Sequence, residues 1–317
     1  MKYIKDFREG ERISGVYLCK NVISAVTKNG KNYLTATLMD KTGTVEAKIW
    51  DPNDPGIADF DKLDYVEVFG EVTVFNGSTQ LNTKRVRVVH EGEYDPAEYL
   101  PMSKRNNDEM YKELLELIAS VKNPFYNALL NELFVKDEAF VKQFRNSSAA
   151  KTVHHGYVGG LLEHTLGVTN LCVYYCKAYP VLKRDLLLTA AMCHDIAKVY
   201  ELSAFPVNDY TDDGQLLGHI VMGAQMVGKI ADSIPNFPPV LKSQLQHCIL
   251  AHHGKYEFGS PKLPAIIEAM ALNYADDTDA KMEIFKEILE NNAGNMEWLG
   301  FNRMFESNLR ATRGLDD

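Results

Sequence analysis

Histidines are concentrated in one part of this sequence, and carboxylates accompany them. Of the nine histidines, only His90 lies outside the stretch from His154 to His253. Histidine is the commonest metal ligand in proteins and the usual acid–base group near neutral pH. One short run, Ala191-Met-Cys-His194-Asp195-Ile-Ala-Lys198, places an imidazole directly beside a carboxylate. This distribution predicts a site at which imidazole and carboxylate groups act together.

His194 and Asp195 follow an apolar stretch, residues 186–192, that is expected to be buried. An imidazole next to a carboxylate is costly to desolvate without partners, and a divalent cation would satisfy both groups. Because a carboxylate has two oxygens, Asp195 could bridge two ions. Imidazole and carboxylate ligation without thiolates suits Mn²⁺, Fe²⁺, Co²⁺, Mg²⁺ or Zn²⁺ rather than a structural cysteine zinc site.

Other histidines and acidic residues surround this pair in the order H…HD…H…HH…D. His164 and a later aspartate would complete the ligands of one ion, and His219 with the pair His252-His253 would supply nitrogens to a second. A single histidine at a helix end is usually a hydrogen-bonded structural residue. The combination on consecutive predicted helices instead favours metal ligation.

The elements that must position these residues follow from the hydrophobic pattern. Five segments rich in β-branched and aromatic residues are separated by turn signals: 13–22, 33–38, 44–49, 65–75 and 79–89. Residues 51–60 leave room for a short helix. Five strands with a small helix between the third and fourth are the layout of an OB-fold barrel, with an SH3-like barrel as the alternative.

The pattern becomes helical near Asn107, which we predict as a helix cap. Further helices are expected near residues 124–134, 136–144, 158–178, 182–199, 217–232, 239–252 and 264–290. The predicted fold class is therefore two-domain β + α, an N-terminal OB-fold-like five-stranded barrel followed by an all-α bundle. The predicted divisions are 1–92 for the barrel, 93–122 for a linker and connecting helix, 123–290 for the bundle and 291–317 for a tail.

Composition limits the classes of function. The chain has 317 residues, 45% hydrophobic and 24% charged, which is ordinary globular composition. Its formal net charge of −9 means that nucleic acid would have to be bound through local basic groups or metal ions. No apolar run approaches the ~20 residues of a bilayer span, and the N-terminus is charged, so we expect a cytoplasmic protein without a membrane partner.

The five cysteines never occur as C-x-x-C and are expected to be thiols in a reducing compartment. Cys172 and Cys176 lie one helical turn apart, but no second pair would complete a zinc site, so we predict that they pack in the core.

Three longer runs match the motifs of a known superfamily. They are His154-His155-Gly-Tyr-Val-Gly-Gly-Leu-Leu-Glu-His164-Thr, His194-Asp195-Ile-Ala-Lys198, and His252-His253-Gly-Lys-Tyr-Glu-Phe-Gly-Ser-Pro261, the last followed by Asp276-Asp-Thr-Asp-Ala-Lys281. Their order resembles the H…HD…D motif of HD-domain phosphohydrolases. The chain as a whole resembles the YhaM-type 3′–5′ exoribonucleases, which join an N-terminal OB-fold to a C-terminal HD domain.

This resemblance implies a divalent-metal-dependent phosphodiesterase that shortens single-stranded RNA from its 3′ end and releases nucleoside 5′-monophosphates. Single-stranded DNA is a second candidate substrate. Two metal ions are implied, with Mn²⁺ first among the candidates. The implied ligands are His164, His194, Asp195 and Asp276 for the first ion, and His219, His252 and His253 for the second, bridged by Asp195. Asp277 is the alternative to Asp276.

The implied catalytic residues are His194, Asp195 and Lys198. Lys198 corresponds to the lysine of HD-x-x-K, which contacts the substrate phosphate in relatives, whereas an ordinary solvated helix lysine is the alternative. His154 and His155 either contact phosphate or ribose or are an ordinary pair at the start of a helix.

The barrel would hold the single strand. Trp50, Tyr33 and Phe75 offer stacking surfaces for bases, and Lys84 and Arg85 could follow the backbone. The alternative is that such aromatic residues fill the core of a small barrel.

Two other functions stay open at this stage. One is an HD-type phosphodiesterase or nucleotidase for small or cyclic nucleotides, and the other is a non-catalytic single-strand-binding accessory factor. The aromatic residues of the tail either cover the helical domain or contact another subunit of a homo-oligomer.

Overall fold

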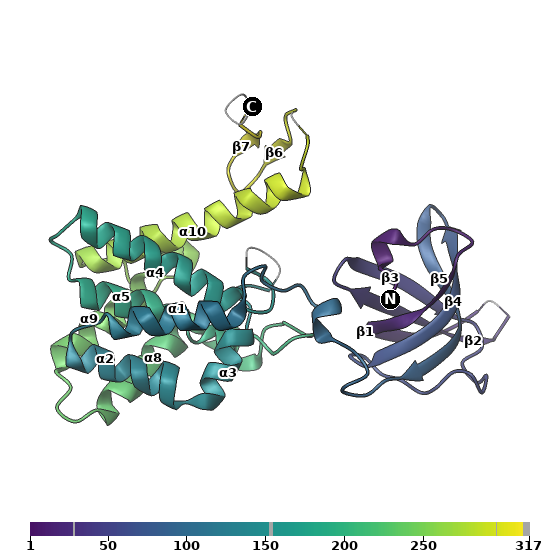
Figure 1. Cartoon of the computed structure of the whole chain (residues 1–317), viewed down its shortest axis with the longest axis horizontal. Coiled ribbons are helices and arrows are strands. Elements are labelled where there is room, and N and C mark those ends of the chain that lie inside the picture. The colour runs from purple at the N-terminus through teal and green to yellow at the C-terminus, as the bar shows by residue number, and fades with distance from the viewer. Residues whose placement is uncertain (28, 152–154, 296, 313–317) are drawn as a thin grey trace. The chain divides into compact units, whose positions relative to one another are not determined.

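The computed structural model describes residues 1–27, 29–151, 155–295 and 297–312. The chain forms two compact units, which are Met1–Met102 with Phe205–Val207, and Ser103–Ala204 with Asn208–Asp317. Each unit has a hydrophobic core of its own, formed by strands in the first and by helices in the second (Figure 1).

The first unit is a closed five-stranded barrel. Its strands are β1 (Arg12–Val26), β2 (Asn32–Asp40), β3 (Gly43–Ile49), β4 (Tyr65–Phe75) and β5 (Ser78–Val88), flanked by the short 3₁₀ turns η1 (Ile4–Asp6) and η2 (Pro96–Glu98). The strand order is β1-β2-β3-β5-β4, and β4 pairs back onto β1. All neighbours are antiparallel except β3 and β5. This order confirms the OB-fold prediction over the SH3-like alternative.

The short helix expected between β3 and β4 is absent. Residues 51–60 instead form turns, in which the Oδ1 atom of Asp54 accepts a hydrogen bond from the backbone N–H of Gly56 at 2.7 Å. Pro52 and Pro55 lack the N–H groups that a helix would need here. Ile57 then makes an isolated bridge to Val86 of β5, which ties the connection to the barrel wall.

A bulge on β5 turns two consecutive cationic side chains toward solvent. Phe69 pairs with Arg85 and the next residue, Gly70, pairs with Thr83, so that Lys84 is the extra residue. A Cβ atom at Gly70 would lie 2.6 Å from the carbonyl oxygen of Asn82, so only glycine fits at this point. Strand alternation would have placed Lys84 and Arg85 on opposite faces, and the bulge removes that constraint.

The second unit is a helical bundle. Its helices are α1 (Asn107–Ala119), α2 (Pro124–Asn131), α3 (Glu138–Asn146), α4 (Gly160–Ala178), α5 (Arg184–Cys193), α6 (Lys198–Glu201), α7 (Asp212–Leu216), α8 (Gly218–Ser233), α9 (Pro239–Ala251) and α10 (Ile267–Asn291). A π-helical turn, η3 (Glu132–Lys136), follows α2, and a 3₁₀ turn, η4 (Tyr256–Phe258), follows α9. The helical prediction for this part of the chain is confirmed.

Two details of the helices differ from the prediction. The cap of α1 is Asn106 rather than Asn107, since its side chain accepts hydrogen bonds from the N–H groups of Asp108 and Glu109. The single helix expected over 182–199 is divided, because α5 ends at Cys193 and the chain turns before α6.

Helix α5 is at the centre of the bundle and explains where the polar pair is held. All its residues from Leu186 to Cys193 are buried, and it packs against α2, α4, α9 and α10. His194 and Asp195 come directly after it, so the chain leaves this apolar helix at a point that other helices surround.

The chain beyond α10 forms a small hairpin of β6 (Gly300–Asn302) and β7 (Ser307–Leu309) at the far end of that helix (Figure 1). Phe305 packs edge-on against Phe285 of α10, with ring centroids 5.2 Å apart, while Trp298 and Phe301 remain exposed. Part of the tail therefore covers α10. Among the described helices, none combines the length and apolar character that crossing a membrane requires.

Candidate metal centre

Five elements bring the seven predicted metal ligands together in the second unit. His164 lies on α4 and Asp276 on α10, His194 and Asp195 follow α5, His219 is in the first turn of α8, and His252 and His253 follow α9. His164, His194, Asp195 and His252 are almost completely buried. Residues separated by more than 100 positions thus share one small polar site within an apolar bundle.

The first group of ligand atoms lies around one carboxylate oxygen of Asp195. His164 Nε2 is 3.2 Å from His194 Nε2 and 3.2 Å from Asp276 Oδ1. Asp195 Oδ2 is 3.3 Å from His194 Nε2 and 3.5 Å from His164 Nε2. Two imidazoles and two carboxylates therefore meet within the spacing that a single cation requires.

The second group faces the other oxygen of Asp195. His219, His252 and His253 each offer a ring nitrogen, and the three atoms lie within 4.8 Å of one another. Asp195 Oδ1 is 3.4 Å from His219 Nε2 and 3.7 Å from His252 Nε2. Asp195 therefore lies between the two groups of candidate ligand atoms.

Unsatisfied atoms in the second group test whether a cation fits there. Asp195 Oδ1, His219 Nε2 and His252 Nε2 are buried without a hydrogen-bond partner in the described structure. The Nδ1 atoms of His219 and His252 face Glu201 Oε1 and the carbonyl oxygen of Ile249, which assigns the proton to Nδ1. Their Nε2 atoms therefore direct lone pairs at Asp195 Oδ1. Buried lone pairs that face one another are unfavourable, and a cation would satisfy all three.

The protonation tendencies of these groups agree with this interpretation. Burial, reinforced by His253 and His194, lowers the pKa of His252 well below its ordinary value. Burial would raise the pKa of Asp195, but Lys198 and His194 hold it well below its usual range. A neutral imidazole beside an ionised carboxylate is the form that binds a metal ion.

His164 stands among carboxylates in the first group. Burial acts to lower its pKa, but hydrogen bonds with Asp195, Asp276 and Asp279 raise the pKa well above the ordinary value for histidine. In the protein without metal these carboxylates therefore favour the protonated imidazole. A divalent cation would replace that proton and neutralise the same negative charge.

Lys198 and the two candidate aspartates on α10 can now be placed. Lys198 Nζ is 2.7 Å from Asp195 Oδ2 and its side chain is 13% exposed, so it is not a solvated helix lysine. Asp276 faces the histidines, whereas Asp277 is exposed and pairs with Lys281. The geometry thus favours Asp276 over Asp277 as the ligand on α10.

His155 is buried, and its Nε2 atom lies 3.1 Å from Asp279 Oδ2. This position makes it a partner of Asp279. The other predicted substrate histidine, His154, lies outside the described residues.

The predicted RNA-binding residues of the barrel are all on its surface. Trp50 is 53% exposed and stacks on Tyr33, with ring centroids 5.2 Å apart and ring planes 28° from parallel. Phe75 is likewise exposed at the end of β4. Lys84 and Arg85 line a hollow of about 570 Å³ on the barrel. None of these side chains is used to fill the barrel core.

Two carboxylates that support the ligands were not identified as functional from the sequence. Glu201 Oε1 lies 2.8 Å from His219 Nδ1, and Asp279 Oδ2 lies 2.7 Å from His164 Nδ1. A carboxylate on the second ring nitrogen orients a metal-binding histidine. The position of Asp279 three residues after Asp276 was a signal in the sequence, but Glu201 had none.

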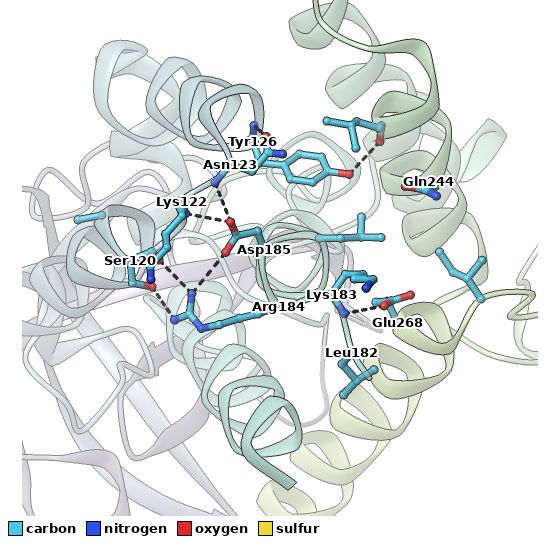
Figure 2. A pocket seen from close by; sticks show the side chains of 14 residues that line it. Ser120, Lys122, Asn123, Tyr126, Leu182, Lys183, Arg184, Asp185, Gln244 and Glu268 are labelled. Atoms are coloured by element: carbon cyan, nitrogen blue, oxygen red, sulfur yellow. Dashed lines mark hydrogen bonds and ion pairs between the residues drawn. The ribbon is translucent and has the colours of Figure 1, made fainter. Parts of the chain in front are cut away.

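A larger hollow in this unit, of about 890 Å³, lies at the end of α1 and the first turns of α2, α5, α9 and α10 (Figure 2). Both carboxylates that line it accept hydrogen bonds from backbone N–H groups. Asp185 accepts hydrogen bonds from the N–H groups of Lys122 and Asn123, and Glu268 accepts one from that of Lys183. These contacts hold the chain just before α2 and α5, so we assign the hollow a structural role, and it does not include the histidines.

Comparison with known proteins agrees with this architecture. Residues 19–89 match the family of OB-fold nucleic acid binding domains, and residues 161–281 match the HD domain family. The chain is 34% identical over 290 residues to the 3′-5′ exoribonuclease YhaM of Geobacillus sp. (strain WCH70), across 91% of this chain and 88% of that protein. The chain belongs to the YhaM family. In this YhaM-family protein the OB-fold domain precedes the HD domain, and the HD domain implies binding of divalent metal ions.

Among solved structures, the YhaM-family chain is similar to the second OB-fold domain of replication protein A from Methanococcus maripaludis. That likeness has 15% sequence identity and a TM-score of 0.24, and it covers 30% of this chain and 98% of that one. It carries no weight for function.

Proposed function

We propose that this protein is a divalent-metal-dependent 3′–5′ exoribonuclease that hydrolyses single-stranded RNA to nucleoside 5′-monophosphates. The observation that carries the proposal is the position of Asp195, whose two oxygens face two separate sets of ligand atoms. Two-ion sites of this kind are used by nucleases and phosphatases for in-line displacement at phosphorus. The family relationship supports the choice of RNA and of the 3′ end.

The ligands proposed for the first ion are His164, His194, Asp195 and Asp276, and those for the second are His219, His252, His253 and Asp195. Mn²⁺ is the first candidate, since imidazole with carboxylate ligation suits it, and Fe²⁺, Co²⁺ and Mg²⁺ are alternatives. When bound, such ions supply Lewis acidity, which acidifies water and polarises phosphoryl oxygens.

The protein's own groups orient the substrate. The ammonium of Lys198 is held beside Asp195 and retains some exposure, so it can bind an oxygen of the scissile phosphate. The apolar helices around His194 and Asp195 limit water around the reacting phosphate and strengthen these electrostatic interactions. His155, and His154 with it, is proposed as a second contact for the 3′-terminal nucleotide.

The barrel is proposed to hold the strand upstream of the cut. Trp50 stacked on Tyr33 offers an exposed ring to a base, and Lys84 with Arg85 offers charge to the backbone. In this division of labour residues 1–92 bind RNA, 93–122 connect the domains, 123–290 cut, and 291–317 form a tail. The five cysteines are all free, which suits work in a reducing cytoplasm.

The direct test is digestion of a 5′-labelled single-stranded 20-mer RNA by the full-length protein with Mn²⁺. We expect a ladder of products that shorten from the 3′ end, and none from the same oligonucleotide with a blocked 3′ end. His194→Ala should abolish the ladder, whereas His90→Ala, a histidine on the exposed surface outside the site, should not. Absence of shortening with Mn²⁺, Fe²⁺, Co²⁺ and Mg²⁺ alike, or turnover of small nucleotides alone, would contradict the proposal.

A further inference from the structure

His164 is held at both ring nitrogens by carboxylates from one helix. Its Nε2 atom is 3.2 Å from Asp276 Oδ1, and its Nδ1 atom is 2.7 Å from Asp279 Oδ2. The two aspartates are three residues apart on α10 and so lie on the same face of that helix. Only Asp276 faces the other ligand atoms, which leaves Asp279 behind the imidazole.

Asp279 has its own support. The oxygen that accepts from His164 also lies 3.1 Å from His155 Nε2. One carboxylate oxygen of Asp279 therefore lies within hydrogen-bond distance of two imidazoles, which fixes its position.

The backbone at His155 is strained in a way that serves this contact. Its φ angle is +55°, a left-handed conformation that costs a residue with a side chain roughly 1 kcal/mol. Its carbonyl oxygen lies against Gly160, where a Cβ atom would approach to 2.0 Å. On its other ring nitrogen, His155 Nδ1 is 3.0 Å from the hydroxyl of Tyr157, which donates to Glu163 Oε2 at 2.9 Å. The contact with Tyr157 therefore fixes the His155 ring with its Nε2 atom facing Asp279.

Helix α4 leaves space for the same carboxylate. Gly167 is three residues after His164, and a Cβ atom built there would lie 2.0 Å from Asp279 Oδ1. A carboxylate fixed by two hydrogen bonds cannot move aside without losing them. Glycine at 167 is therefore required for Asp279 to reach His164, although it costs helix stability of about 1 kcal/mol relative to alanine.

We propose that Asp279 is a positioning residue for the nuclease reaction, which orients His164 toward the first metal ion while His155 and Gly167 fix Asp279 in place. This inference rests on the proposed function for the presence of two ions. It goes beyond that function because it assigns a role to Asp279 and Gly167, which are proposed neither as metal ligands nor as RNA contacts.

The test is a Mn²⁺ titration of the full-length, metal-stripped protein without RNA, with free Mn²⁺ followed by electron paramagnetic resonance. Loss of a partner behind a metal-binding histidine weakens affinity about 10- to 100-fold. We expect Asp279→Ala to weaken the binding of one of the two Mn²⁺ ions by this factor and to leave the affinity for the other ion unchanged. Asp279→Asn keeps an acceptor without charge and should have a smaller effect. Asp277→Ala, two residues away on the exposed side of α10, is the control and should bind as the wild type does.

Gly167→Ala tests the same idea without removing any polar group. It should weaken binding of the same Mn²⁺ ion that Asp279→Ala affects. Gly223→Ala is the control and should leave the affinities unchanged, because a Cβ atom at this helix glycine would make only ordinary van der Waals contacts. If the Asp279→Ala variant binds each of the two ions as tightly as the Asp277→Ala control does, the inference is overturned and the proposed function stays intact. Failure of the wild type to bind two Mn²⁺ ions would instead overturn the proposed function.

Discussion

Replacing Asp195 by asparagine should separate the metal-binding role of this residue from its role in stability. In the wild type, Asp195 Oδ2 is 2.7 Å from Lys198 Nζ, and the two side chains are 2% and 13% exposed. The substitution removes the carboxylate that faces both ligand sets and leaves the ammonium buried without its nearest counter-charge.

The stability effect follows from the burial of this pair. Removing one partner of a buried ion pair costs about 3–5 kcal/mol, because the other charge stays desolvated. For a unit of about 200 residues, each kcal/mol lowers the melting temperature by roughly 2–4 °C. We therefore expect Asp195→Asn without metal to melt about 6–20 °C below the wild type.

The catalytic effect has a different cause. Lewis acidity of bound ions contributes several kcal/mol to the transition state, and each 1.36 kcal/mol corresponds to a factor of ten in rate. Loss of about 4 kcal/mol lowers the rate of RNA shortening on the order of 10³-fold. Metal analysis after dialysis against Mn²⁺ should find fewer than two ions per chain.

A second variant distinguishes the two effects. Asp195→Asn combined with Lys198→Met removes the buried ammonium, so the melting temperature measured in EDTA should recover toward the wild type while activity stays lost. If the double variant melts as low as Asp195→Asn, the buried charge is not the cause of the instability. If Asp195→Asn keeps two ions and full activity, the bridging role of Asp195 is wrong.

Two further predictions concern other parts of the chain. Trp50→Ala should weaken binding of a single-stranded 20-mer by about 5- to 150-fold in a filter-binding assay, since base stacking on an aromatic ring contributes about 1–3 kcal/mol. Tyr174→Ala removes a ring of the helical unit that is at least as exposed as Trp50, and it should leave binding unchanged. Burial raises the pKa of Cys19 to about 11 and that of Cys248 to about 12, so at pH 8 their thiolate fractions are small. In the native protein, the half-buried Cys176 should react with an aromatic disulfide reagent faster than the other four thiols. All five should react at similar rates only after unfolding. Rapid reaction of all five in the native state would contradict the assigned burial.

Much of the architecture could be read from the sequence because it depends on local patterns. Alternation of apolar residues and turn signals identified the five strands, and helical periodicity identified the bundle. Short-range features were less certain. The prolines of residues 51–60 prevent a helix that the length of the connection allowed, and the bulge at Lys84 depends on how β4 pairs with β5.

The types and order of the candidate ligands were also visible in the sequence, since imidazole and carboxylate chemistry does not depend on the fold. What only the tertiary structure decided is which atoms face one another. His164 and Asp279 are 115 residues apart, and their contact depends on how closely α4 approaches α10 at Gly167. The pairing of Glu201 with His219 and of Lys198 with Asp195 likewise arises from the turn after α5. Residue types determine what chemistry is available, but the distances between groups from separate helices are set by packing, which no local pattern encodes.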